Sequence, residues 1–334
     1  MQFLKARSMS LLLVISLTIL LTGGITGEAT AKVYKIRIAS HMASSDPTGI
    51  ACVRLGELLD KKSKGRIKAS VHNDAELGKQ REVVEMVRDG AVEITTSGPG
   101  AGSAYVIELA LLDLPYLYDD SAHYLRVLKA LSPDFEKLLS PYNIKPLGAM
   151  VIGFRHMLNK KRPIYKVSDL KGLKMRAPIP MYLQMFNALG ADGTTVTWSE
   201  VYTALQSGVV DGMEASPALI YAMKFHEQAK YLSKTYHIAS SFYFFTCKNW
   251  FESLPKDLQD AVFQATEEAS DYHFKVQTEA DQKALDKLIA EGVKVNEVGD
   301  LNEFRQKCLD FRNEYVQKKG PQAEKFYKKI LAIK

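Results

Sequence analysis

Cysteine is scarce in this sequence. Only Cys52, Cys247 and Cys308 occur among 334 residues. Three thiols cannot all pair with one another, so the chain is not a scaffold framed by disulfides. Each cysteine lies among apolar neighbours, which indicates buried and unreactive thiols. The remaining composition, 46% hydrophobic and 25% charged, is typical of a globular protein of one large or two smaller domains.

Long apolar runs are absent after the first 31 residues. Lys5 and Arg7 form a basic start, and Leu11–Leu21 is too short to span a bilayer comfortably. Ala29-Thr30-Ala31 is a small-x-small cleavage site. The pattern predicts a secretory signal peptide over residues 1–31, cut before Lys32, with no lipid anchor because no cysteine lies near the site. We therefore expect a soluble, exported protein of 303 residues after cleavage.

Basic tracts and catalytic motifs are also absent. The net charge is +6, or +5 without the leader, and Lys160-Lys161-Arg162 is too short for a nucleic-acid surface. There is no Gly-x-Ser-x-Gly, no His-Glu-x-x-His and no cysteine/histidine metal spacing. Asp211 and Glu214 could form an acid/base pair, but a turn at Asp211-Gly212 is the simpler interpretation. The sequence predicts no cofactor, no metal and no nucleic-acid partner.

What the sequence contains is an alternation of strand and helix patterns. Asp46-Pro47 predicts a helix start, with a capping side chain followed by proline in the first turn. The alternation predicts an α/β fold with a mostly parallel sheet. The predicted strands cover residues 34–38, 67–71, 92–96, 148–154, 173–176, 194–197, 209–212 and 240–247, and the predicted helices begin near residues 47, 79, 181 and 199.

A run of about 36 residues, Asp257–Gly292, has no proline and no internal glycine. That length is unusual for one helix of a globular protein. We interpret it as a brace that spans more than one lobe.

Leu170–Pro178 places one arginine at the end of a short strand. Leu173 and Met175 alternate with Lys174 and Arg176, and Pro178 ends the ladder. Ligands of open α/β sheets bind beyond the carboxyl ends of strands, and a guanidinium fits a carboxylate through two parallel hydrogen bonds. A surface arginine in a weak ion pair is the alternative for this segment alone.

Other side chains follow predicted strands in the same half of the chain. Arg155 follows Val151–Phe154, Trp198 follows Thr194–Thr197, and Met213–Pro217 follows Val209–Gly212. Thr197-Trp198-Ser199-Glu200 has the pattern of a capping box. Taken singly, Trp198 could be a core residue and Arg155 a surface ion pair. Together they favour a site that clamps a flat anion beside an aromatic ring.

Three segments resemble the solute-binding proteins of tripartite ATP-independent periplasmic (TRAP) transporters, the dicarboxylate-receptor family. Ala75-Glu76-Leu77-Gly78 with Arg81-Glu82 is similar to the family's Gln-Leu-Gly segment. Asp169–Pro178 is similar to its Asp-Leu-Lys-Gly-Leu-Lys-x-Arg-x-Pro signature. Trp198–Glu214 is similar to its aromatic-Ser-Glu-x-Tyr-x-Ala-Leu-Gln-x-Gly-x-Val-Asp-Gly-x-Glu signature. The resemblance covers the chain after the leader.

The resemblance implies a two-lobed periplasmic binding protein of the type II-like architecture, with hinge-crossing segments and a long bracing helix. We expect lobe I over residues 32–152 with a return near 240–285, and lobe II over 153–239. The brace would cover residues 257–292, and residues 293–334 would pack on the lobes. The implied function is that of a periplasmic, monomeric receptor that delivers an organic acid to TRAP permease subunits.

The resemblance also implies a set of ligand-binding residues. Arg176 matches the arginine that binds the ligand carboxylate, Arg155 a second arginine, and Trp198 an aromatic residue beside the carboxylate. The full expected set is Arg176, Arg155, Trp198, His41, Ala215, Ser216, Met213, His237, Gly98 and Phe242.

Two departures from the family pattern bear on the ligand. Ala215-Ser216 stands where many members carry an asparagine, and Thr96–Gly100 lacks the charged side chains of sialic-acid receptors. The aromatic and apolar candidates favour a hydrophobic or aromatic 2-oxo or hydroxy monocarboxylate, with dicarboxylates and sugar acids left open. These candidates are Trp198, Phe154, Tyr118, Met213 and Phe242. The alternatives to a TRAP receptor are a receptor of an ATP-driven (ABC-type) importer, a sensor-associated binding module and a secreted enzyme.

Overall fold

The computed structural model describes residues 32–334, and the predicted signal peptide lies outside the described residues. The strands are β1 (Tyr34–Ser40), β2 (Ile67–His72), β3 (Ile94–Ser97), β4 (Ile144–Asn159), β5 (Lys174–Ala177), β6 (Asp192–Thr195), β7 (Gly212–Ala215), β8 (Tyr231–Cys247) and β9 (Lys294–Glu297). The α-helices are α1 (Pro47–Lys62), α2 (Gln80–Arg88), α3 (Pro99–Gly102), α4 (Ser121–Leu139), α5 (Pro180–Ala188), α6 (Val201–Ser207), α7 (Pro217–Ala222), α8 (Lys248–Ser253), α9 (Lys256–Ala290), α10 (Asn302–Lys319) and α11 (Pro321–Ala332). Short 3-10 helices are η1 (Ile107–Asp113), η2 (Ser140–Tyr142), η3 (Val167–Leu170), η4 (Trp198–Glu200) and η5 (Phe225–Glu227).

The first helix begins where the sequence predicts. Asp46 is the N-cap of α1, and its carboxylate accepts a hydrogen bond of 2.8 Å from the backbone N–H of Thr48. Pro47 occupies the first turn, where its missing N–H leaves no intrahelical bond unmade. No helix within residues 32–334 has both the length and the apolar character needed to cross a membrane.

The nine strands found within residues 32–334 belong to one sheet. Its order is β2-β1-β3-β8-β4-β7-β5-β6, and β9 pairs with β8 outside this path. β1 is parallel to β2 and β3, and β5 is parallel to β6 and β7, as the alternating pattern predicts. β4 and β8 depart from that prediction, because they run antiparallel to each other and to their neighbours β7 and β3.

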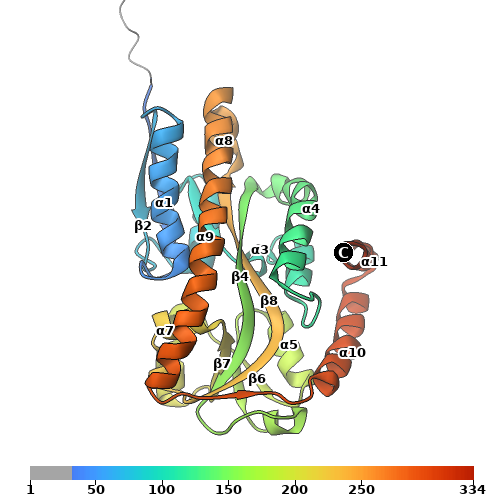
Figure 1. The fold of residues 1–334 in the computed structure, drawn as a ribbon. Coiled ribbons are helices and arrows are strands. Elements are labelled where there is room, and N and C mark those ends of the chain that lie inside the picture. The colour runs from blue at the N-terminus through green and yellow to red at the C-terminus, as the bar shows by residue number, and fades with distance from the viewer. Residues whose placement is uncertain (1–31) are drawn as a thin grey trace, which may run out of the picture. The chain divides into compact units, whose positions relative to one another are not determined.

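The two long strands join two halves of the sheet. β3 pairs with the end of β8 at Tyr243–Thr246, whereas β7 pairs with the opposite half of the molecule, at His156–Asn159 of β4. Figure 1 shows β4 and β8 side by side through the middle of the fold. Because they continue from one half to the other, residues 33–334 form one compact unit. The β4–β8 register shifts at three places, between Pro146 and Met157.

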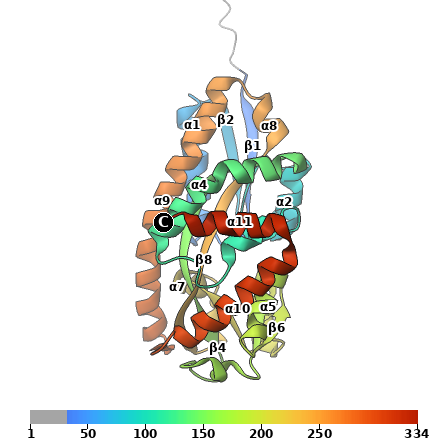
Figure 2. The same ribbon diagram turned by 90° about the vertical axis from the view of Figure 1, so that its right-hand side faces the viewer.

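The predicted brace is confirmed as α9, a helix of 35 residues. It packs against α1 in one half of the fold, along β4, and against α7 in the other half (Figures 1 and 2). The lobe boundaries expected near residues 152 and 239 stay a prediction.

Helices cover both faces of the sheet and bury a separate hydrophobic cluster on each. Successive residues of the long strands point to opposite faces, so Val151 and Phe245 join one cluster while Ile152 and Phe244 join the other. α4, α5, α10 and α11 cover the first face, and α1, α6, α7 and α9 cover the second. All three cysteines are buried and free, as predicted.

Three local predictions were wrong. β7 begins at Gly212, where the sequence pattern predicted a strand to end, so Met213–Ala215 lie within it. Arg155 lies inside β4 instead of following a strand, because β4 continues to Asn159. The capping box at Thr197 is not formed, since Thr197 caps η4 without a side-chain hydrogen bond and Glu200 pairs with Lys79.

Candidate ligand-binding site

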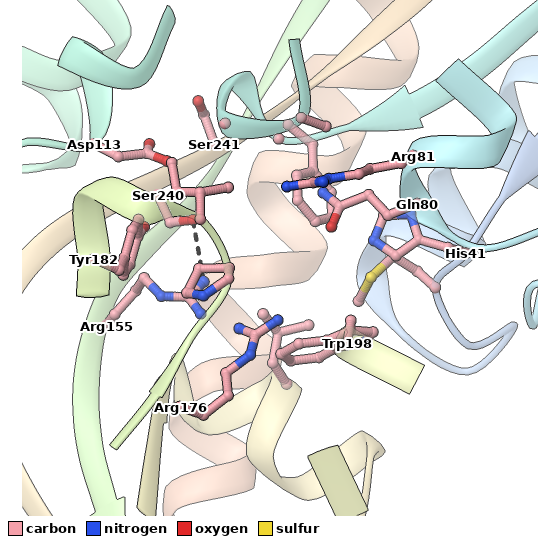
Figure 3. A pocket seen from close by; sticks show the side chains of 18 residues that line it. His41, Gln80, Arg81, Asp113, Arg155, Arg176, Tyr182, Trp198, Ser240 and Ser241 are labelled. Atoms are coloured by element: carbon pink, nitrogen blue, oxygen red, sulfur yellow. Dashed lines mark hydrogen bonds between the residues drawn. The ribbon is translucent and has the colours of Figure 1, made fainter. Parts of the chain in front are cut away.

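A cavity lies between the two halves of the fold, beside the middle of β4 and β8. It contains roughly 650 Å³ of space free of protein atoms, part of it open to solvent. Figure 3 shows Arg176 and Trp198 entering from one side and Gln80, Arg81 and Asp113 from the other. The lining residues are His41, Met42, Gln80, Arg81, Gly98, Gly100, Ala101, Asp113, Arg155, Arg176, Pro178, Ile179, Tyr182, Trp198, Leu219, Ser240, Ser241 and Phe242.

Six of the ten predicted site residues line this cavity. Five segments that are distant in the sequence contribute them: the loop after β1, the end of β3, the middle of β4, β5 with η4, and β8. The six residues are His41, Gly98, Arg155, Arg176, Trp198 and Phe242.

The other four predicted residues do not line it. Met213 and Ala215 point to the hydrophobic core on one face of β7, because the strand places Glu214 between them on the opposite face. Ser216 is the fully buried N-cap residue of α7. His237 is buried, and its Nδ1 lies 2.8 Å from the Thr235 hydroxyl. The sequence pattern placed Met213 and Ala215 after a strand, whereas the structure places them within β7. His237, expected only from the family resemblance, lies within β8.

Arg155 is already paired with a carboxylate of the protein. Its Nε and Nη2 both donate to the side chain of Glu214, Nη2 at 3.0 Å, and Nη2 also donates to the Glu214 carbonyl at 2.6 Å. Nη1 donates to the Ser240 hydroxyl at 3.3 Å (Figure 3). Burial acts to lower the pKa of Arg155, but the charge of Glu214 outweighs it and the pKa is raised. Arg155 is therefore a fixed cation whose charge Glu214 balances.

Arg176 has a weaker set of partners. It is 2% exposed, its Nε donates to the Val196 carbonyl at 3.0 Å, and its Nη1 lies 3.9 Å from Glu214 Oε1. Burial lowers its pKa to about 10, with Glu214 opposing and Arg155 adding to the shift. The guanidinium stays charged at neutral pH. Because Glu214 is already bonded to Arg155, Arg176 carries the positive charge that an anionic ligand would balance.

An aromatic side chain and an imidazole lie beside this charge. The Arg176 guanidinium carbon lies 5.5 Å from the centroid of the Trp198 ring, within the range of a cation–π contact. The Trp198 Nε1 has no hydrogen-bond partner among residues 32–334. Burial, with a smaller contribution from Arg176, lowers the pKa of His41 to about 4, so its ring is neutral at pH 7. Both groups can hydrogen-bond to ligand oxygens.

Several lining residues escaped the sequence prediction. Glu214, which does not itself line the cavity, was considered only as half of an acid/base pair, yet it holds Arg155 in place. Asp113 ends η1 and Tyr182 lies in α5, and neither segment has a pattern that marks a site. Gln80 and Arg81 follow the Leu77-Gly78 motif, which could have indicated them. Within residues 32–334 there is no group of three His, Cys, Asp or Glu side chains that could hold a metal ion.

Most of the sequence matches a known protein family. Residues 38–319 match the DctP family, described as "Bacterial extracellular solute-binding protein, family 7". The chain belongs to this family. A solute-binding protein of Verminephrobacter eiseniae is 35% identical over 78% of each chain. The 2,3-diketo-L-gulonate-binding periplasmic protein YiaO of Escherichia coli is 30% identical over 78% of this chain and 80% of its own.

Solved structures of DctP-type receptors are also similar to this fold. A TRAP periplasmic solute-binding protein of Roseobacter denitrificans with bound β-D-glucuronate has a TM-score of 0.86 and 25% identity, covering 90% of this chain and all of its own. The sugar acid-binding protein DctPAm of Advenella mimigardefordensis, in complex with galactonate, has a TM-score of 0.84 and 27% identity, over 90% and 97%. A Bordetella protein with density attributed to pantoate has the same TM-score and identity, over 90% and 99%.

These relatives confirm the fold class and the type of protein. The chain has the two-lobed α/β fold of the TRAP solute-binding proteins, and it is a solute receptor of the DctP family and not an enzyme. The ATP-driven importer and secreted-enzyme alternatives are therefore set aside.

Proposed function

We propose that this DctP receptor binds an organic monocarboxylate in the cavity between its lobes and delivers it to a TRAP membrane permease. The observation that carries the proposal is the buried Arg176 guanidinium, which lines the cavity beside Trp198 and has no carboxylate nearer than Glu214, at 3.9 Å, among residues 32–334. A ligand carboxylate would supply the missing negative charge through two parallel hydrogen bonds. The ligands named for the structural neighbours support this choice, since glucuronate, galactonate and pantoate are all carboxylates.

The residues that line the cavity support an aromatic ligand less strongly than the sequence-based prediction suggested. Of the five apolar candidates, only Trp198 and Phe242 line the cavity. Tyr118 and Met213 are core residues, and Phe154 packs against the hydrophobic core. Polar groups from Gln80, Ser240 and Ser241 line the cavity instead. A hydroxylated acid is thus better matched than an aromatic 2-oxo acid.

The proposed function also requires export to the periplasm and an interaction with TRAP permease subunits. The receptor would be a periplasmic monomer released by cleavage before Lys32, because residues 1–31 have the composition of a signal peptide. N-terminal sequencing of protein from the periplasmic fraction should begin at Lys32. Delivery can be tested by reconstituting uptake with the TRAP permease subunits, where transport of the bound acid should require the receptor.

The binding test is substitution of Arg176. Removing one partner of a desolvated charge pair costs about 2–5 kcal/mol, so Arg176→Ala should weaken carboxylate binding at least tenfold. Arg176→Lys should not restore full affinity, because an ammonium cannot make the planar two-point contact. Isothermal titration calorimetry with the tightest ligand of an organic-acid panel measures both effects. Arg126→Ala, which changes an exposed arginine outside the cavity, is the matched control. Near wild-type affinity in a folded Arg176→Ala protein would contradict the proposal.

A further inference from the structure

Asp113 is a buried carboxyl group in the cavity wall. It is the last residue of η1, is 7% exposed and lines the same cavity as Arg176. Its Oδ1 has no hydrogen-bond partner within the described residues 32–334. A buried polar atom without a partner costs free energy, so its presence calls for an explanation. Figure 3 shows it across the cavity from Arg176.

The groups that face Asp113 satisfy it only in part, because the Tyr182 hydroxyl hydrogen-bonds to the carboxyl group while Oδ1 keeps no partner within residues 32–334. They come from three elements: Arg155 on β4, Glu214 on β7 and Tyr182 on α5. Arg155 is bonded to Glu214 through two nitrogens and forms no ion pair with Asp113. Burial raises the pKa of Asp113 to about 7, Arg155 opposes the shift, and Glu214 adds to it. The Oδ1 atom of Asp113 can therefore accept a hydrogen bond from a ligand in the cavity.

The charges around the cavity limit what that partner can be. Glu214 balances Arg155, so Arg176 is the deeply buried cation that the described residues leave available to a ligand. A second carboxylate at the Asp113 end would meet a like charge, which disfavours ionisation of both groups. A hydroxyl can instead donate a hydrogen bond to Asp113. A site built to bond a hydroxyl rejects analogues that lack it, because its own buried group is then left unpaired.

We propose that Asp113 is a specificity-determining residue that accepts a hydrogen bond from a ligand hydroxyl while Arg176 holds the ligand carboxylate. The cavity then selects hydroxylated monocarboxylates of the sugar-acid kind over dicarboxylates and over unsubstituted acids. This inference rests on the proposed function, because it assumes that the carboxylate lies at Arg176. Asp113 and Arg176 approach from opposite sides, so a ligand must reach across the cavity to contact both.

The test compares four named acids by calorimetry at pH 7.5: D-galactonate, D-glucuronate, hexanoate and succinate. In the wild-type protein, at least one hydroxylated acid should bind ten times more tightly than both hexanoate and succinate. In Asp113→Asn, which keeps the side-chain shape, that preference should fall at least tenfold. Asp119→Asn, a highly exposed aspartate, is the matched control and should leave the preference unchanged.

Each outcome decides a separate point. If folded Asp113→Asn still prefers the hydroxylated acid to the same extent, the proposed role of Asp113 is overturned. If the melting temperature also falls, Asp113 has a structural role only. Should the variant fail to fold, the wild-type panel decides: hexanoate or succinate bound as tightly as the hydroxylated acids overturns the inference. Succinate binding that Arg81→Ala abolishes would place a second carboxylate at Arg81 instead and also overturn it. If no acid on a wider organic-acid panel binds, the proposed function itself fails.

Discussion

At the scale of single residues, the cavity separates two arginines that look equivalent in the sequence. Arg155 is bonded to a protein carboxylate, whereas Arg176 has none within hydrogen-bonding distance in the described part of the chain. The sequence identified both arginines, because each is flanked by a strand pattern. It could not assign their different roles, since these depend on Glu214. That residue lies within β7, where the sequence pattern had placed it after a strand, and there it bonds to Arg155. Asp113 and Tyr182 were not predicted because only tertiary packing brings them to the site.

Glu214 should be important for stability as well as for the site. It is fully buried, and Glu214→Gln would leave Arg155 buried without a counter-charge. Breaking a buried pair in this way costs about 3–5 kcal/mol. Urea unfolding monitored by circular dichroism should show this loss. Glu227→Gln, at an exposed glutamate that pairs with the Tyr202 hydroxyl, provides the comparison. A loss below about 1 kcal/mol for Glu214→Gln would mean that the pair is dispensable.

Trp198 should report on ligand binding through its fluorescence. The protein has two tryptophans, and Trp250 lies in α8, outside the cavity lining. A saturating carboxylate ligand should change the emission, and Trp198→Phe should remove most of that change while keeping much of the affinity. Phenylalanine retains an apolar ring face for packing. If Trp250→Phe removes the fluorescence change and Trp198→Phe does not, Trp198 packs in the hydrophobic core and does not contact the ligand.

At the scale of elements, the best predictions came from strong local signals. The Asp46-Pro47 start of α1 and the proline-free run of α9 depend on neighbouring residues alone, and both are confirmed. β4 and β8 were predicted too short. Nearly every residue of β8 is buried, so it lacks the alternation that marks a half-buried strand. Their antiparallel course comes from pairing across the molecule, which a single sequence does not reveal.

The cap of α1 should make stability depend on pH. Burial raises the pKa of Asp46 from 3.8 to about 6. The hydrogen bond that its carboxylate accepts from the Thr48 N–H opposes this shift, and the nearby charge of Asp281 adds to it. The folded state therefore holds this proton more tightly than the unfolded state. The ionised carboxylate destabilises the fold above about pH 6, and the penalty disappears below about pH 4.

Asp46→Asn should remove that penalty, because asparagine caps helices as well as aspartate does. The variant should be more stable than wild type by roughly 1–3 kcal/mol at pH 7.5, and the gain should vanish near pH 4. Urea unfolding at the two pH values measures it. Asp120→Asn, at the exposed cap of α4, should show little gain at either pH. An equal gain for Asp46→Asn at both pH values would show that its charge is not the cause.

At the scale of the whole molecule, residues on either side of the cavity contact each other. Lys79 beside α2 pairs with Glu200 of η4 at 2.6 Å, and Ile179 lies close to Gly100. β4 changes register between Val151 and Met157 and has Gly153 at a positive φ of 93°. Such irregular positions in strands that cross between lobes are where a hinge would bend.

Ligand binding should therefore make the protein more compact. Small-angle X-ray scattering should give a smaller radius of gyration with saturating ligand than without it. Arg176→Ala, measured at the same ligand concentration, should remain at the larger value. An unchanged radius at proven saturation would contradict a hinged receptor.

The incomplete pairing of Arg176 affects how often the receptor closes without a ligand. When the lobes close without cargo, they bury a guanidinium whose nearest carboxylate is already engaged. Such burial is unfavourable, so we expect the vacant closed form to be rare. An anion cancels this cost and makes closure favourable. If the receptor delivers its ligand to a TRAP permease as proposed, the permease would meet a closed receptor almost only when ligand is bound, and empty receptors would seldom compete for docking.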